Sequence, residues 1–347
     1  MGRSRLALVL GWALMVLSVA GCGSQSPSSA TTAFERLPIP TGLYSGVAWL
    51  PAGWIVVEYS PGSGSSSELW RLRPDGSDFE RIPLTADPAC RRTEYIDPTA
   101  LPDGNLGFVK WCFGPGVRLY LESYEWDSGE EIRLLTHELP FNPRQFTLDP
   151  GMRSGFMSTL SDICGTIATF NRNQVQPLPI RITDHGHSWR LDDYFRSDPA
   201  RPCINEGRAD WPTLSADGSQ LAFLASGPAP GVHDFARLNL PWSIFVADHT
   251  GLAPRAVFSG VSDPRGLAWS PDGQWLAFAG QIDGRGNGTW LFEPTSHRLI
   301  RASVKNLDEL AWSPNGQQIV GVFNPNPPQW PPRGQVLILD VATTYSP

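Results

Sequence analysis

A short turn motif recurs six times along the chain and constrains the fold more than any other feature. In the two clearest copies Leu-Ala-Trp-Ser-Pro precedes Asp or Asn and then Gly, and an apolar segment follows. The copies occupy residues 46–53, 97–104, 145–151, 211–218, 266–273 and 309–316. Proline presets φ for a tight turn, Asp or Asn tolerates the next position, and glycine takes a left-handed conformation. Six such turns between apolar segments predict six β-hairpins.

A second hairpin follows each of the first. Glu68–Leu72, for example, turns at Pro74-Asp-Gly76 into Phe79–Leu84. Each unit is therefore a four-stranded antiparallel meander of about 52 residues, the size of a propeller blade. Phe34–Ile39 nearly repeats Phe79–Leu84, while the last unit lacks a clear fourth strand. We expect an all-β, six-bladed β-propeller over residues 34–347, closed by pairing of residues 34–39 with the strand at 335–341.

The repeated Trp/Leu-Ser-Pro-Asp/Asn-Gly pattern resembles the WD40-like PD40 repeats of TolB-type propellers. The resemblance covers most of residues 46–323 and is weakest at 145–156. It implies a six-bladed ring and, as for TolB, a periplasmic protein-binding role. TolB also carries a separate N-terminal α/β domain, for which this sequence shows no corresponding segment.

Composition excludes several other classes. The 347 residues include 34 Gly and 33 Pro, which are poor in helix interiors, so a helical bundle is excluded. A hydrophobic content of 41% can form a large core and argues against disorder. The net charge of −7 and the lack of a basic stripe argue against nucleic-acid binding. We expect a monomer with no nucleic-acid partner.

The first residues have the features of an export signal. Arg3 and Arg5 precede an apolar run, and Val-Ala-Gly-Cys22 resembles the cleavage box of bacterial lipoproteins. We expect a signal peptide at 1–21, lipidation at Cys22 and a flexible Ser/Gly-rich tether at 22–33. Loss of the leader changes the net charge from −7 to −9. The lipid places the protein at a membrane in the cell envelope, outside the cytoplasm.

Four cysteines remain, at positions 90, 112, 164 and 203. An even number in an exported chain suggests two disulfides, for which three connectivities are possible. Threading the sequence onto a propeller puts all four cysteines at one end of the ring. We therefore predict Cys90–Cys112 and Cys164–Cys203.

The meander also predicts where binding residues lie. The turns within each hairpin share one end of the ring, the turn face, while the connections between hairpins and between blades share the other, the loop face. Long segments are predicted on the loop face at 60–67, 86–96, 183–210, 227–241, 281–288 and 324–334. Long loops on a rigid scaffold commonly carry function. We expect the loop face to bind a protein or an envelope component.

Candidate contacts on this face are His185, His187, Trp189, Tyr194 and Trp330. An alternative for the aromatic residues is that they hold the loops against the body of the protein. The histidines and nearby aspartates have the side chains of metal ligands, yet they are also ordinary polar loop residues, and we predict no metal. The tryptophans at 49, 269 and 312 recur at one blade position and are expected to pack in the core.

Motifs for enzymatic chemistry are mostly lacking. The sequence has no Gly-x-Ser-x-Gly elbow, no phosphate-binding glycine loop, no dinucleotide fingerprint and no paired CxxC, so no catalytic residue or cofactor is predicted. The alternative to a binding module is a propeller hydrolase, such as a calcium-dependent lactonase-like enzyme. Such an enzyme requires several carboxylates to converge at the mouth of the central channel.

Overall fold

The computed structural model describes residues 34–62, 64–136, 138–139, 142–161, 164–184, 187–190, 207–227, 241–325 and 334–342. All of them belong to the second of two compact units, Thr32–Pro347. The signal peptide and tether predicted at 1–33 lie outside this part of the chain. In the part that is described, no helix is long and apolar enough to span a bilayer.

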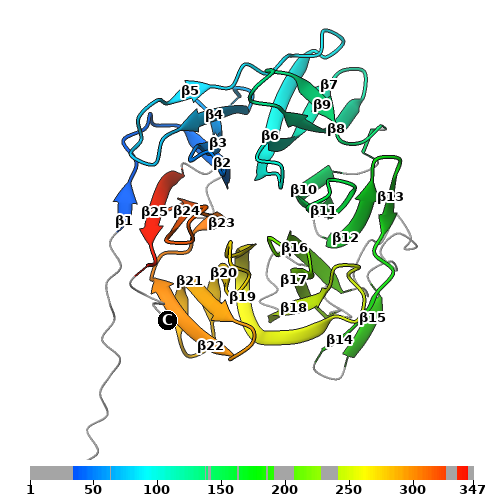
Figure 1. Ribbon diagram of the computed structural model, residues 1–347, viewed down its shortest axis with the longest axis vertical. Coiled ribbons are helices and arrows are strands. Elements are labelled where there is room, and N and C mark those ends of the chain that lie inside the picture. Colours follow the sequence, from blue (N-terminus) through cyan, green and yellow to red (C-terminus); the bar gives the residue numbers. More distant parts are fainter. Residues whose placement is uncertain are drawn as a thin grey trace, which may run out of the picture. The chain divides into compact units, whose positions relative to one another are not determined.

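The described residues form antiparallel sheets arranged around a common centre (Figure 1). Blade 1 comprises β2 (Leu43–Trp49), β3 (Ile55–Ser60), β4 (Glu68–Leu72) and β5 (Glu80–Arg81). Blade 2 comprises β6 (Arg92–Ala100), β7 (Leu106–Phe113), β8 (Val117–Tyr124) and β9 (Glu131–Arg133). Blade 3 comprises β10 (Asn142–Leu148), β11 (Ser154–Ser161), β12 (Cys164–Asn171) and β13 (Gln174–Pro177).

The remaining blades include one shared strand and one strand borrowed from the start of the chain. Blade 4 comprises β16 (Arg208–Leu214), β17 (Gln220–Ser226), β18 (Trp242–Asp248) and the first half of β19 (Arg255–Trp269). Blade 5 comprises the second half of β19 with β20 (Leu276–Ile282), β21 (Gly286–Glu293) and β22 (Arg298–Ser303). Blade 6 comprises β23 (Asp308–Trp312), β24 (Gln318–Phe323), β25 (Gln335–Asp340) and β1 (Phe34–Arg36).

The long strand β19 joins two blades without a connecting loop. Its residues up to Val261 pair with β18, and its residues from Val261 onward pair with β20. Divided at Val261, the seven-stranded sheet becomes two four-stranded units, which gives six units in total. The innermost strands β2, β6, β10, β16, β19 and β23 each contact the next in this order, and β23 contacts β2. The described strands therefore form a closed ring, as predicted.

The N-terminal strand closes the ring. Phe34 lies opposite Leu339 and Arg36 opposite Leu337, and the Leu37 N–H donates to the Val336 carbonyl (3.3 Å). Phe34 also packs against the apolar cluster between blades 5 and 6. The predicted pairing with the strand at 335–341 is thus confirmed for residues 34–37 of the predicted 34–39, and β1 supplies the fourth strand of blade 6.

The turns within the first hairpins share one geometry. In the last two copies the glycine N–H donates to the serine carbonyl three residues earlier, at 2.9 Å for Gly273 and 2.8 Å for Gly316, with φ of 68° and 71°. The degraded third copy differs from the prediction. There Met152, not Gly151, takes the left-handed position (φ 55°) and donates to Asp149.

The core consists of apolar clusters at the contacts between blades. Trp49, Trp269 and Trp312 are at most 7% exposed, as expected of packing residues. The Trp312 indole N–H also donates to the Ala268 carbonyl of blade 5 (3.1 Å). A large side chain at this repeated position therefore fills the interface between neighbouring inner strands.

Several of the predicted loops are partly strand. Residues 281–288 form a tight hairpin, because β20 and β21 remain paired as far as Ile282 and Gly286, and Gly284 and Gly286 take positive φ. The segment 86–96 ends earlier than predicted, because β6 begins at Arg92. The insertion at 183–210 contributes a two-stranded sheet of β14 (Arg181–Asp184) and β15 (His187–Arg190). Residues 191–206, 228–240 and 326–333 lie outside the described residues.

Candidate functional site

Every inner strand has an irregularity at the same place, near the first residue of each repeated motif. This residue has positive φ in four of the strands. It is Asp97 in β6 (53°), Trp211 in β16 (52°), Gly266 in β19 (80°) and Glu309 in β23 (50°). The pairing of each of these strands with its neighbour shifts register there. A β-bulge re-aims a side chain and is frequent next to functional sites. The bulges therefore form a ring around the centre of the molecule.

Polar side chains connect this ring across the centre. The Gln145 amide of β10 donates to the Glu309 carboxylate of β23. These strands are third and sixth in the ring, so the bond joins opposite blades. The Arg265 guanidinium of β19 bonds Asp263 (2.9 Å) and Asp308 of blade 6 (2.9 Å). At the level of the bulges, one hydrogen bond thus joins opposite blades and one ion pair joins the neighbouring blades 5 and 6.

A buried carboxylate lies beside the bulge of blade 2. Glu58 on β3 is 8% exposed and accepts the backbone N–H of Asp97 (3.4 Å). Burial raises the pKa of Glu58, and the nearby Glu94 carboxylate raises it further. Hydrogen bonds from Ser45 and Ser67 act in the opposite direction. A Cβ at Gly46 would collide with Pro98 (2.7 Å) and lie close to Glu58 Oε2 (3.3 Å), so the absence of a side chain there leaves room for both.

Only one group of potential metal-ligating atoms is close-packed among the described residues. Asp87, Cys90 and Cys112 bring three such atoms within 4.8 Å of one another. Two of them are the sulfur atoms of a disulfide, so they are not thiolate ligands. The carboxylates around the bulges do not form such a group.

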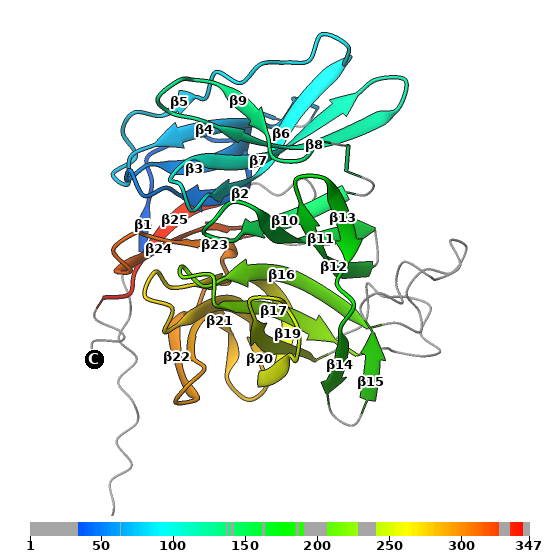
Figure 2. The ribbon, with the colours of Figure 1, turned by 45° about the vertical axis from the view of Figure 1, so that its right-hand side comes forward.

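Among the described residues, the strand pairing of blade 2 extends farther on the loop face than that of the other blades. Beyond its bulge β6 makes five residue pairs with β7, from Arg92 to Ile96. The equivalent strands β2, β10, β16, β19 and β23 make one to three pairs with their neighbours. Two additional pairs correspond to about 7 Å of strand. We call residues 92–95, 110–113 and 117–120 the blade 2 extension; the β7–β8 hairpin protrudes in Figure 2.

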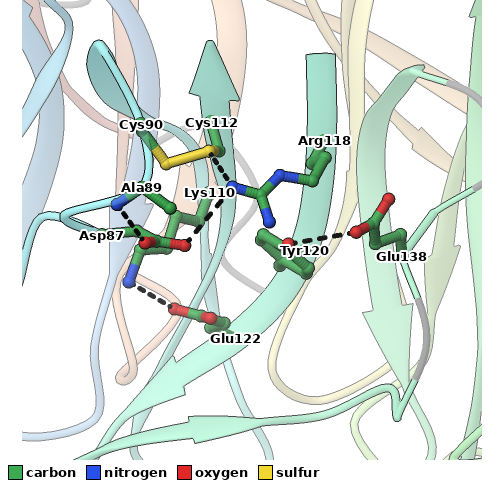
Figure 3. Close-up of a disulfide and its surroundings, with 9 residues drawn as sticks. All are labelled: Asp87, Ala89, Cys90, Lys110, Cys112, Arg118, Tyr120, Glu122 and Glu138. Atoms are coloured by element: carbon green, nitrogen blue, oxygen red, sulfur yellow. Dashed lines mark hydrogen bonds and ion pairs between the residues drawn. A yellow bond between two sulfur atoms is a disulfide. The ribbon is translucent and has the colours of Figure 1, made fainter. Parts of the chain in front are cut away.

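A disulfide fixes one side of the extension. Cys90, in the connection between β5 and β6, is bonded to Cys112 of β7, with a Cα–Cα distance of 5.2 Å. Arg118 on β8 donates to Cys112 Sγ (3.1 Å) and lies 3.8 Å from the Asp87 carboxylate (Figure 3). The Arg91 N–H donates to the Phe113 carbonyl (2.7 Å). The connection is therefore held to the extension by covalent, ionic and backbone contacts.

The other side of the extension bears aromatic and basic side chains. Because side chains alternate along a strand, Arg92, Trp111, Phe113 and Val117 share one side. The Arg92 guanidinium lies 4.5 Å from the Phe113 ring centre, and the Trp111 and Phe113 rings are 5.6 Å apart. Val117 is 59% exposed, although most valines are buried. These side chains form a partly exposed aromatic surface on a braced sheet.

The structure places the predicted site residues unevenly. Cys90 and Cys112 form the predicted disulfide. Cys22, His185, Tyr194, Cys203 and Trp330 lie outside the described residues, and only the backbone of Cys164 and His187 is described, in β12 and β15. The Cys164–Cys203 pairing therefore remains a prediction.

Trp189 requires a correction. It was predicted on the binding face, yet its side chain is only 6% exposed and packs in the core cluster shared by blades 3 and 4. A Cβ at Gly207 would collide with its ring, so the indole fills the space that this glycine leaves. Trp189 holds the β14–β15 hairpin against blade 4.

Sequence reasoning missed both the bulge residues and the blade 2 extension. A signal for the bulges was available, because the first residue of each motif copy varies between Gly, Asp, Gln, Trp and Glu while later positions repeat. A position that varies within an otherwise repeated motif indicates a role other than common packing. The extension has no comparable signal, because its strands continue the ordinary alternation of the sheet.

Comparison with known proteins identifies the fold. No protein-family description and no curated protein matches the sequence. TolB from Acinetobacter baumannii aligns with 15% identity and a TM-score of 0.50, over 86% of this chain and 63% of TolB. An oligogalacturonate lyase from Vibrio parahaemolyticus aligns with 10% identity and a TM-score of 0.52, over 92% and 96% of the two chains. An oligogalacturonate lyase in complex with manganese aligns with 10% identity and a TM-score of 0.50, over 90% of this chain and 94% of the lyase. At these identities the likeness shows the fold alone: the chain is an all-β propeller similar to that of TolB.

Proposed function

We propose that this protein is a lipid-anchored, extracytoplasmic binding module that recognises a protein partner through its loop face. The observation that carries the proposal is the blade 2 extension. It carries Arg92, Phe113 and Val117 on a sheet that a disulfide braces from behind, with Trp111 beside them and partly buried against the cluster between blades 2 and 3.

The chemistry of this surface fits a protein partner. Tryptophan, phenylalanine and arginine are enriched in protein–protein interfaces, and tryptophan and arginine account for many of the residues that dominate binding energy. Side chains held on a braced sheet also lose little freedom on binding, which favours affinity. The stacking of Arg92 on Phe113 provides such a preorganised pair.

Three features support a location outside the cytoplasm. Disulfides persist in oxidising compartments, and Cys90 is bonded to Cys112. The N-terminal sequence has the order of an export signal, with Cys22 at a lipoprotein cleavage box. The resemblance of the repeats to those of TolB-type propellers implies a periplasmic location for this chain. Lipidation at Cys22 is tested by metabolic labelling with a tagged fatty acid, which we expect to label the wild type and not Cys22→Ser.

The binding proposal is tested by cross-linking in intact envelopes, followed by binding of the purified partner. We expect Trp111→Ser with Phe113→Ser to weaken binding at least tenfold, which corresponds to about 1.4 kcal/mol. Trp54→Ser, which alters a tryptophan next to the first turn of blade 1 on the turn face, is the matched control. Equal affinities of the two variants would overturn the choice of face, whatever the result of lipid labelling.

A further inference from the structure

The two sulfur atoms of the Cys90–Cys112 disulfide have different environments. Cys112 is completely buried within β7, whereas Cys90 is half-buried in the connection between β5 and β6. An external thiolate must reach one sulfur in line with the bond that breaks. Of the two residues, Cys90 is the accessible one, so Cys112 becomes the leaving group.

The leaving group has a cation beside it. The Arg118 guanidinium donates to Cys112 Sγ at 3.1 Å (Figure 3). A disulfide sulfur is neutral and a weak acceptor, while a thiolate accepts a charge-assisted hydrogen bond from the same donor. Arg118 therefore stabilises the separating thiolate more than the intact bond, and this difference accelerates cleavage.

We propose that Cys90 is a site of thiol–disulfide exchange with an external thiol. The thiolate of the external thiol attacks Cys90 Sγ and forms a new sulfur–sulfur bond. The Cys90–Cys112 bond breaks, its electron pair goes to Cys112 Sγ, and Arg118 holds the resulting thiolate. Return of the Cys112 thiolate to Cys90 releases the external thiol and restores the disulfide, so no net oxidant is consumed.

Asp87 opposes this chemistry, so its substitution provides a second test. Its carboxylate is within 4.8 Å of both sulfur atoms and 3.8 Å from Arg118. A negative charge at this position disfavours a thiolate on Cys112. We therefore expect opposite effects of neutralising Arg118 and neutralising Asp87, which a general loosening of the loop does not produce.

Exchange at Cys90 does not require blade 2 to open. The Arg91 N–H is bonded to the Phe113 carbonyl, and the Cys90 N–H to the Asp87 carbonyl (3.0 Å). The first bond holds the connection beside β7 when the disulfide is broken, and the second keeps the turn that precedes Cys90. The modified cysteine then lies behind the aromatic surface of the blade 2 extension.

The test treats the full folded chain with reduced glutathione, quenches with acid, alkylates free thiols and locates glutathione by mass spectrometry. We expect the adduct on Cys90, with opening about three- to tenfold slower in Arg118→Gln and faster in Asp87→Asn. Arg118→Lys retains a positive charge and should restore part of the rate. Arg133→Gln is the matched control, because Arg133 of the same blade stacks on Tyr120 instead of contacting sulfur.

The proposal is overturned by an adduct on Cys112 or by opening in Arg118→Gln that is as fast as in wild type. Faster opening in both Arg118→Gln and Asp87→Asn would also overturn it, because that result indicates a loosened loop. Tryptophan fluorescence and thermal unfolding establish that each variant is folded before exchange is measured.

Discussion

Glu58 illustrates how one side chain links the bulges to stability. Its carboxylate is buried between blades 1 and 2 and accepts the backbone N–H of Asp97, a residue with positive φ. Backbone conformations of this kind persist only where surrounding contacts enforce them. Burial, the larger cause, raises the pKa of Glu58, so ionisation of this carboxyl group destabilises the folded state.

We predict that Glu58→Gln gains stability relative to wild type as pH rises. The folded-state pKa of Glu58 lies above the usual 4.5. At pH values between the two pKa values, the folded state therefore binds more protons than the unfolded state. Wild-type stability therefore falls as pH rises from the unfolded-state pKa to the folded-state pKa of Glu58, by about 1.4 kcal/mol for each pH unit between them. Glutamine lacks this dependence. Urea unfolding at pH 4 and pH 7.5 measures the effect, and an equal difference at both pH values would contradict it.

At the scale of single elements, the repeated turns offer a matched comparison. Gly273 and Gly218 occupy equivalent turns of blades 5 and 4, with φ of 68° and 70°. A Cβ at Gly273 has Ser215 as its nearest neighbour, at 3.9 Å, whereas a Cβ at Gly218 would collide with Pro150 of blade 3. The first substitution therefore tests backbone conformation alone, and the second adds a clash between blades.

We expect Gly273→Ala to cost about 1 kcal/mol and Gly218→Ala about 2–4 kcal/mol. Denaturant unfolding of the two variants and the wild type measures the difference. A cost for Gly218→Ala no greater than that for Gly273→Ala would show that the contact with Pro150 relaxes without penalty.

The same elements show which features sequence predicts. The turns were predictable because proline, aspartate and glycine act locally, and the closing strand because Phe34–Ile39 resembles Phe79–Leu84. The merging of two blades in β19 was not, because it depends on how Val261 pairs with strands on either side. The burial of Trp189 was equally hidden, since an indole in a loop suits both a core and a binding surface.

At the scale of the whole molecule, three residues of β1 complete the ring. Replacing Phe34, Glu35 and Arg36 by Gly-Ser-Gly removes the partner of β25 and leaves an unpaired strand edge. We expect a lower Tm and self-association detectable by light scattering. The same replacement at residues 24–26, in the predicted tether, is the control. Unchanged Tm and monodisperse scattering would contradict a closing role for β1.

The pairing of β1 with β25 also fixes an order of events in time. All strands of blade 1 lie within residues 43–81, and the strands of blades 2 to 5 follow in chain order. β1 has no partner until Leu337, Ile338 and Leu339 arrive, about 300 residues later in synthesis. Cutting the chain short before β25 therefore leaves β1 without a partner strand, and synthesis of β25 sets the earliest time at which the ring can close.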